Sequence, residues 1–187
     1  RLDHVDLRYS GYGGGSYGHL VGIENDGGDV EIKNSNIHDN YANLFDWVIG
    51  HYRSGSSVSQ KSGTLSILDS TLDNSGNGVS VESGAATISG NIIKNNEGYS
   101  AGYGVHFYGG ESLALFNNTF VGNRRTASVS ASTLFTHGGN TSTDSTNRGF
   151  EIGGPLSGDT TFSGDDLPYI VGHITVGVGQ TLTLDPG

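Results

Sequence analysis

Residues 30–40 read VEIKNSNIHDN, and four other segments of the chain repeat their pattern of apolar and polar residues. Three copies are residues 65–75 (LSILDSTLDNS), 86–96 (ATISGNIIKNN) and 113–123 (LALFNNTFVGN), and a shorter copy opens the chain at residues 2–10 (LDHVDLRYS). In every copy one apolar residue is followed five residues later by another. The aligned pairs are Leu2/Leu7, Ile32/Ile37, Ile67/Leu72, Ile88/Ile93 and Leu115/Phe120. Self-similarity at a period of a few tens of residues indicates a solenoid.

The spacing of the copies favours strands over helices. The aligned position recurs at residues 2, 32, 67, 88 and 115, so successive copies lie 30, 35, 21 and 27 residues apart. A helical solenoid holds its period nearly constant, whereas a parallel β-helix tolerates loops of different length between short stacked strands. The alternation in Val79-Ser80-Val81 and Val105-His106-Phe107 is also that of a strand. We therefore expect an all-β fold, a parallel β-helix.

Each coil is expected to contain three strands. The first holds Val21-Gly22-Ile23, Val79-Ser80-Val81 or Val105-His106-Phe107, and the other two carry the two members of each aligned apolar pair. Each set should stack along the axis at about 4.8 Å per coil. Asn40, Ser75, Asn96 and Asn123 end the four longer copies. We expect them to accept left-handed backbone at the corners and to pass amide hydrogen bonds from coil to coil.

Composition excludes several classes of function. The 187 residues include 9 Lys and Arg against 19 Asp and Glu, a net charge of −10. An acidic surface argues against nucleic acid and against anionic membranes as partners, and it is compatible with calcium or neutral sugars. There is no cysteine, hence no thiol metal site or disulfide. No apolar run approaches the roughly 18 residues of a membrane span, so no membrane insertion is expected.

The regular pattern divides the chain unevenly. We expect residues 1–148 to form the coils with lateral loops, among them residues 11–18 and an excursion at 52–63 that explains the longest step. Residues 124–148 lose the apolar pattern and are expected to form an irregular loop, with one more coil around Ser128–Phe135 as an alternative. Residues 149–168 are expected to be a polar connector, and 169–187 the start of a further module or a cap. Because both ends fall within strand-like sequence, we expect a segment of a longer protein.

The repeats resemble those of a known superfamily. Residues 2–11, the Asn-Ser-x-Ile corner at 34–37, the Asn-Asn-x-Phe corner at 117–120 and residues 169–187 resemble the right-handed parallel β-helix repeats of the pectate-lyase-like superfamily. The similarity is greatest to carbohydrate-binding and sugar-hydrolase type modules of bacterial extracellular proteins. This resemblance implies a right-handed coil, an extracellular or cell-surface location and a polysaccharide or cell-surface glycan as partner. It does not by itself define an activity.

Residues suited to catalysis are few. A polysaccharide lyase needs a base for the α-proton, a cation to neutralise the uronate and often carboxylates to hold calcium. His106 is the one outward residue of the first strand that could act as the base, and Arg124 and Arg125 could neutralise a uronate. An exposed, idle histidine is the simpler interpretation of His106.

Carboxylates offer an alternative chemistry. A hydrolase would need two of them roughly 5–9.5 Å apart, and the candidates are Asp26, Asp29, Glu31 and Asp46. Asp26-Gly27-Gly28-Asp29 is first a turn between strands, with calcium binding by Asp26 and Asp29 as a weaker alternative. Asp165-Asp166 has the same ambiguity. The histidines show no metal-site spacing, so no cofactor other than calcium is considered.

Aromatic residues are plentiful in glycine-rich loops, where they could form a platform for sugars. The candidates are Tyr12, Tyr17, Trp47, Tyr52, Tyr99, Tyr103 and Tyr108. We therefore expect a non-catalytic structural or adhesive module that contacts glycans. The enzymatic alternative is a polysaccharide lyase or glycoside hydrolase that uses His106, Arg124 and Arg125. Open strand edges at the ends predict contact with flanking modules or end-to-end assembly of copies.

Overall fold

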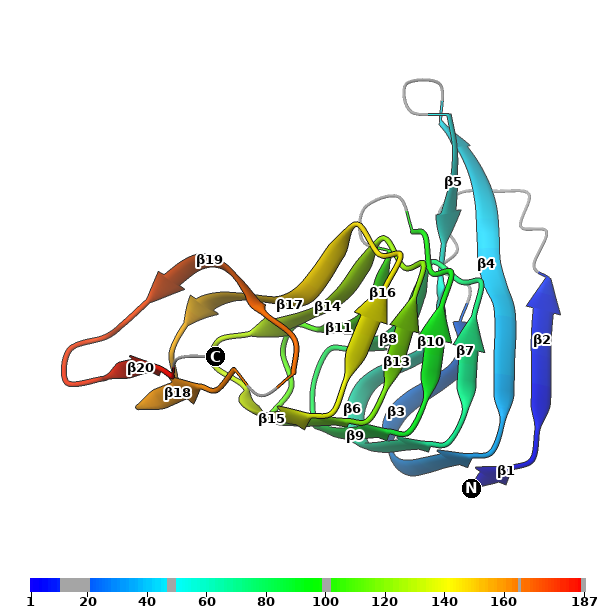
Figure 1. Ribbon diagram of the computed structural model, residues 1–187. Helices are drawn as coiled ribbons and strands as arrows, with labels where there is room; N and C mark the ends of the chain where they lie inside the picture. The colour runs from blue at the N-terminus through cyan, green and yellow to red at the C-terminus, as the bar shows by residue number, and fades with distance from the viewer. Residues whose placement is uncertain (11–20, 47–49, 99–101, 165, 186–187) are drawn as a thin grey trace.

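The strands wind into a solenoid whose coils stack along one axis (Figure 1). The computed structural model describes residues 1–10, 21–46, 50–98, 102–164 and 166–185, and for residues 9, 10, 41–46 and 50–54 it describes the backbone alone. All strand pairs between coils are parallel. The described part of the chain contains no helix long and apolar enough to cross a membrane.

Three columns of strands form the sides of the solenoid. The first column contains the N-terminal halves of β3 (Val21–Lys33) and β6 (Ser56–Leu68), then β8 (Asn77–Val81), β11 (Tyr103–Phe107), β14 (Arg125–Ser130), β17 (Asn147–Pro155) and β19 (Tyr169–Thr175). The second contains β1 (Leu2–Asp3), the C-terminal halves of β3 and β6, β9 (Ala85–Ser89), β12 (Ser112–Phe116) and β15 (Leu134–Gly138). The third contains β2 (Asp6–Ser10), β4 (Asn36–Asp46), β7 (Thr71–Asp73), β10 (Ile92–Lys94), β13 (Thr119–Val121) and β16 (Thr141–Thr143).

The core is a set of apolar stacks, as the repeats predict. Ile32, Ile67, Ile88 and Leu115 pair in register from coil to coil and are fully buried. Ile37, Leu72, Ile93 and Phe120 do the same in the third column. Burial on one face of each strand sets the register, because a shift by one residue would turn every apolar side chain outward. The predicted parallel β-helix is confirmed.

The corner after the third strand differs from expectation by one residue. Positive φ falls on Asp39, Asn74, Asn95 and Gly122, each directly before a predicted corner residue. The predicted residues instead turn inward as a buried ladder: the amide of Ser75 donates to Oδ1 of Asn96, and the amide of Asn96 to Oδ1 of Asn123, both at 3.1 Å. Asn40 differs from the others. Within the described structure its buried side-chain amide has no hydrogen-bond partner, and the pairing of β2 with β4 shifts register beside it.

A second ladder, which the repeats do not predict, follows the corner after the second strand. At each step a backbone amide donates to a side chain of the next coil. The successive residues of this ladder are Ser35, Ser70, Asn91, Asn118 and Asn140. The last step is from the amide of Asn140 to Asp166, at 2.9 Å. The ladder therefore ends on a carboxylate, which accepts bonds and needs no further acceptor beyond it.

The expectation of an irregular loop at residues 124–148 is wrong. β14, β15 and β16 form a full coil, paired with β11, β12 and β13 of the coil before. The apolar pattern fails here because His137 continues the stack above Leu115, and Ser142 continues the stack above Phe120. Backbone pairing to the preceding coil maintains the strands without aliphatic residues at these positions.

The expected connector also contains a strand of the solenoid. β17 pairs with β14, and its Phe150 and Ile152 point inward in register with Ala127 and Val129. β19 pairs with β17 in turn. β18 (Thr160–Phe162) pairs with β20 (Leu182–Leu184) in a separate small sheet. Residues 149–168, expected to be a polar connector, thus contain part of β17 and the whole of β18, and the division of the chain at residues 149 and 169 stays a prediction.

The longest step between repeats has a different cause from the predicted excursion at 52–63. β4 continues beyond its column and pairs antiparallel with β5 (Gly50–Ser54), forming a hairpin that extends away from the coils (Figure 1). Residues 56–63 belong to β6, in register with β3. The extra residues are therefore those of the hairpin.

Candidate functional site

A groove of about 430 Å³ lies on the outer face of the first column. Its lining residues come from β3, β6, β8, β11 and the turns beside them: Val21, Glu24, Gly55, Ser56, Ser59, Lys61, Asn77, Ser80, Glu82, His106 and Tyr108. One row of outward positions runs along it, in register from Glu24 to Ser59, Ser80 and His106. The hollow exists because two successive coils present serine there, while β11 presents an imidazole that closes one end.

The floor of the groove is made of hydrogen-bonding groups. The hydroxyls of Ser56 and Ser80 are 2.9 Å apart. The side-chain amide of Asn77 donates to Oγ of Ser80 at 3.3 Å. These groups come from adjacent rungs, which repeat at about 4.8 Å. Hydroxyl and amide groups on adjacent rungs suit a ligand with repeated hydroxyl groups of its own.

Aromatic rings close the far end. The His106 ring lies 4.5 Å from the ring of Tyr103, in a stacked arrangement, and 4.6 Å from that of Tyr108. Tyr103 is buried, whereas Tyr108 is 48% exposed and presents an apolar face to the groove. Burial lowers the pKa of His106 below its ordinary value of 6.5, so the ring is neutral at pH 7. Burial and then a hydrogen bond to Glu82 raise the pKa of Tyr108 to about 12.

Charged residues flank the groove in two places. Nζ of Lys61 lies 2.7 Å from Oε1 of Glu24, and this bond raises the pKa of Lys61. Beyond His106, the guanidinium of Arg125 hydrogen-bonds the Tyr103 hydroxyl and lies 3.3 Å from Oε2 of Glu151. The hydrogen bond to Tyr103 is the main cause that raises the pKa of Arg125. Arg125 is thus already engaged by neighbouring side chains.

The structure brings together only some of the predicted site residues. His106, Tyr103 and Tyr108 form one cluster, and Arg125 joins it through Tyr103. Arg124 does not join it: its side chain lines a separate hollow with Glu97 and Asp144. Tyr12, Tyr17, Trp47 and Tyr99 lie outside the described residues, and Tyr52 is described only by its backbone, on β5. These aromatic residues stay a prediction.

The predicted carboxylate sites are dispersed. Asp26 and Asp29 flank a bulge within β3, and the Thr64 hydroxyl donates to Asp29 at 2.6 Å. Glu31 pairs with Lys33 at 2.9 Å. Asp46 is described by its backbone alone, and Asp165 lies outside the described residues. Within the described ranges, no group of three or more His, Asp or Glu side chains could hold a metal ion. Calcium binding at Asp26 and Asp29 stays a prediction.

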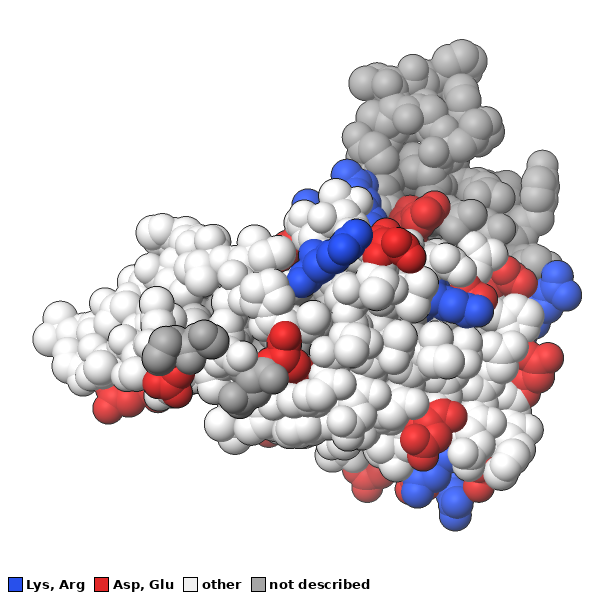
Figure 2. Space-filling model, viewed as in Figure 1, with Lys and Arg blue, Asp and Glu red and all other residues white. Residues whose placement is uncertain are grey.

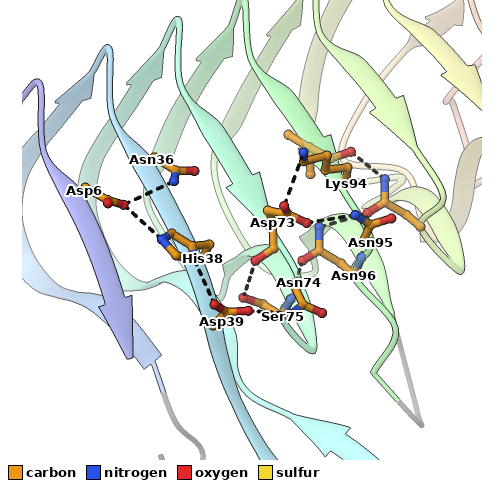
Figure 3. Close-up of polar contacts among 12 residues, drawn as sticks. Asp6, Asn36, His38, Asp39, Asp73, Asn74, Ser75, Lys94, Asn95 and Asn96 are labelled. Atoms are coloured by element: carbon orange, nitrogen blue, oxygen red, sulfur yellow. Dashed lines mark hydrogen bonds and ion pairs between the residues drawn. The ribbon is translucent and has the colours of Figure 1, made fainter. Parts of the chain in front are cut away.

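A second polar cluster lies on the third column (Figure 3). His38 contacts Asp6 at 3.0 Å and Asp39 at 2.9 Å, and the amide of Asn74 donates to Asp39. Hydrogen bonds from Asn74 and then His38 lower the pKa of Asp39. One coil further, Asp73 accepts a hydrogen bond from the side-chain amide of Asn95 and forms an ion pair with Lys94. Each member bonds to its neighbour on the next coil, which makes the cluster a structural ladder along the surface.

Opposite charges alternate on the face that carries this column (Figure 2). Arg8 pairs with Asp39, and Lys94 with Asp73, both at 3.3 Å. Arg8 and Lys94 are therefore each offset by an adjacent carboxylate.

Sequence reasoning missed the polar residues that line the groove beside His106 and Tyr108, namely Glu24, Ser56, Ser59, Lys61, Asn77, Ser80 and Glu82. Ser80 lies in the alternating segment Val79-Ser80-Val81, but a serine carries no signal of a site by itself. Glu82 follows directly after β8. Its position against Tyr108 depends on how the two coils stack. The alternation of the first strand could have identified the row, but the depth of the groove depends on the turns around it.

Stacked parallel strands with internal polar ladders define a solenoid of the β-helix class. A family model described as a right-handed β-helix region matches residues 12–154. The chain belongs to this family, and the right-handed parallel β-helix implied by the resemblance is thereby confirmed. The search of curated proteins found no match. The search of solved structures likewise found none.

Proposed function

We propose that the chain is a non-catalytic module of a secreted or cell-surface protein that binds polysaccharide in the groove of the first column. The main support is the combination of a hydroxyl-lined floor with an aromatic end wall, Ser56 and Ser80 on one side and His106 and Tyr108 on the other. Sugar rings present apolar faces and hydroxyl edges, and this arrangement complements both. A glycan lying along the axis meets one rung about every 4.8 Å, which is close to the length of one sugar residue.

Tyr108→Ala should weaken glycan binding about tenfold, or ~1.4 kcal/mol, because it removes the exposed ring on which a sugar would stack. Isothermal titration calorimetry against a panel of soluble oligosaccharides measures this. Leu134→Ala is the matched control, since Leu134 is a large exposed apolar residue of the second column. Equal affinity of the Tyr108→Ala variant and the unaltered protein for every bound glycan would contradict the platform.

A catalytic role is the second candidate, and the neutral His106 in the groove favours it. A neutral imidazole can accept an α-proton, and Arg125 lies on the next coil. Against it, Arg125 is engaged with Tyr103 and Glu151. Incubation with uronate and neutral polysaccharides, with and without calcium, should release no product. Turnover that is lost in His106→Ala would replace the binding function with a lyase or hydrolase.

Contact through the ends of the solenoid, with flanking modules or further copies, stays a prediction. The exposed apolar side chains Val171, Val176 and Val178 lie on β19 and just after it, where such a contact would begin.

A further inference from the structure

The charge of the groove indicates which class of glycan it binds. Its lining includes two carboxylates, Glu24 and Glu82, and one ammonium, Lys61. Lys61 is bound to Glu24 at 2.7 Å, so these two charges offset each other. Glu82 is exposed, it hydrogen-bonds the uncharged hydroxyl of Tyr108, and its charge adds a smaller contribution, after that of Glu24, to the raised pKa of Lys61. With His106 neutral, the groove carries one negative charge in excess.

That excess charge is next to an aromatic face. The Tyr108 hydroxyl holds Glu82 by a hydrogen bond, so the carboxylate and the half-exposed ring lie together at the end of the groove. A cation near both would gain an ion pair and an interaction with the ring face. The serine floor supplies hydrogen bonds for hydroxyl groups on the adjacent rungs. A sugar that carries a protonated amine among hydroxyls matches all three features.

A uronate polymer does not match. Its carboxylates would meet Glu82 with like charge, and the protein as a whole carries −10. Lys61 and Arg125, the cations near the groove, are both occupied by glutamates. Displacing those pairs would leave carboxylates uncompensated beside the incoming uronate.

We propose that the groove binds a glycan composed of amino sugars with free, protonated amines, with Glu82 and Tyr108 receiving the ammonium group. This inference rests on the proposed glycan-binding function and specifies its ligand class.

The test compares three oligomers of equal length by titration calorimetry: a β-1,4-glucosamine hexamer, its fully N-acetylated form and a galacturonate hexamer. The buffer is held at pH 7, where His106 is neutral and the glucosamine amines are partly protonated, and a chelator is present so that no calcium bridge contributes. We expect the glucosamine hexamer to bind most tightly, the acetylated hexamer less tightly and the galacturonate hexamer least tightly. The affinity for the glucosamine hexamer should fall as salt is added. Glu82→Gln should weaken glucosamine binding roughly two- to fivefold and leave the acetylated oligomer unchanged.

Asp69→Asn is the control variant. It removes the same charge at the corner between the second and third columns, where Asp69 has a φ of 48° that asparagine also accepts. It should leave all three affinities unchanged. Equal binding of the acetylated and free-amine oligomers, or a Glu82→Gln variant that keeps full glucosamine affinity, would overturn the ligand class and leave glycan binding intact. Failure of all three oligomers to bind would contradict both proposals, and preference for the uronate would reverse the assignment.

Discussion

Gly84→Ala should lower the free energy of unfolding by about 2–5 kcal/mol. Gly84 has a φ of +86°, and a Cβ on it would lie 2.1 Å from the carbonyl oxygen of Gly63 on the coil before. A Cβ on Gly63 would likewise lie 2.2 Å from the carbonyl oxygen of Gly28. These glycines stack at the corner between the first and second columns, where backbone meets backbone. Neither coil can move away without breaking the strand pairs on both sides.

Urea denaturation followed by circular dichroism measures this effect. Gly158→Ala is the control, because no atom lies within 4 Å of the added methyl group and φ is outside the left-handed region. It should change stability by less than about 0.5 kcal/mol. If both variants unfold at the same denaturant concentration, close packing at this corner is not what limits the sequence there.

Asp166→Ala should cost about 3–5 kcal/mol, because it leaves several buried donors without an acceptor. The carboxylate accepts the backbone and side-chain amides of Asn140, the amide of Leu167 and Nδ1 of His137. The side chains of Asp166 and His137 are each only 3% exposed. Since a carboxylate only accepts, Nδ1 of His137 is the donor, and Nε2 contacts the hydroxyl of Tyr169. Asp166 therefore ends the second ladder and holds the histidine that continues the apolar stack.

The same residue predicts a pH dependence. Burial raises the pKa of Asp166, but the hydrogen bonds from Asn140 and Leu167 and the nearby His137 outweigh it, so the pKa lies below the ordinary 3.8. A lowered folded-state pKa contributes stability that is fully present above 3.8 and is lost as the pH falls through the folded value. The stability difference between the unaltered protein and Asp166→Ala should thus shrink on acidification below that range.

Thermal unfolding from pH 7 to pH 2 measures that difference. Asp185→Ala, which removes an exposed carboxylate near the C-terminus, should have the same unfolding temperature as the unaltered protein at every pH. A difference between Asp166→Ala and the unaltered protein that stays constant down to pH 2 would show that the carboxyl contributes by shape rather than by charge.

The apolar repeats carried most of the information about the fold. Ile32, Ile67, Ile88 and Leu115 predict their own stack because a strand buried on one face must repeat its apolar residues in register. Hydrogen bonds from coil to coil through Ser75, Asn96 and Asn123 were predicted, but the burial of these side chains was not. The prediction placed the left-handed backbone one residue too late. Asp39, Asn74 and Asn95 are of residue types as well suited to left-handed backbone as the residues that follow them.

Where side chains no longer repeat, the sequence pattern was insufficient. The coil of β14, β15 and β16 places His137 and Ser142 at positions that elsewhere hold aliphatic residues. His137 is tolerated inside only because Asp166, far along the chain, reaches it. The residues around His137 in the sequence therefore do not indicate that it can be buried.

The periodicity alone predicted the stacked strands and the inner apolar columns of the repeated segments up to residue 123, because burial imposes the same requirement on each of those coils. The groove was decided by stacking. Glu24, Ser59, Ser80 and His106 are separated by loops of unequal length, and only backbone pairing between coils aligns them in one row. The pairing of Glu82 with Tyr108 arises in the same way, since neither residue repeats and each acquires its neighbour from the register of the coils.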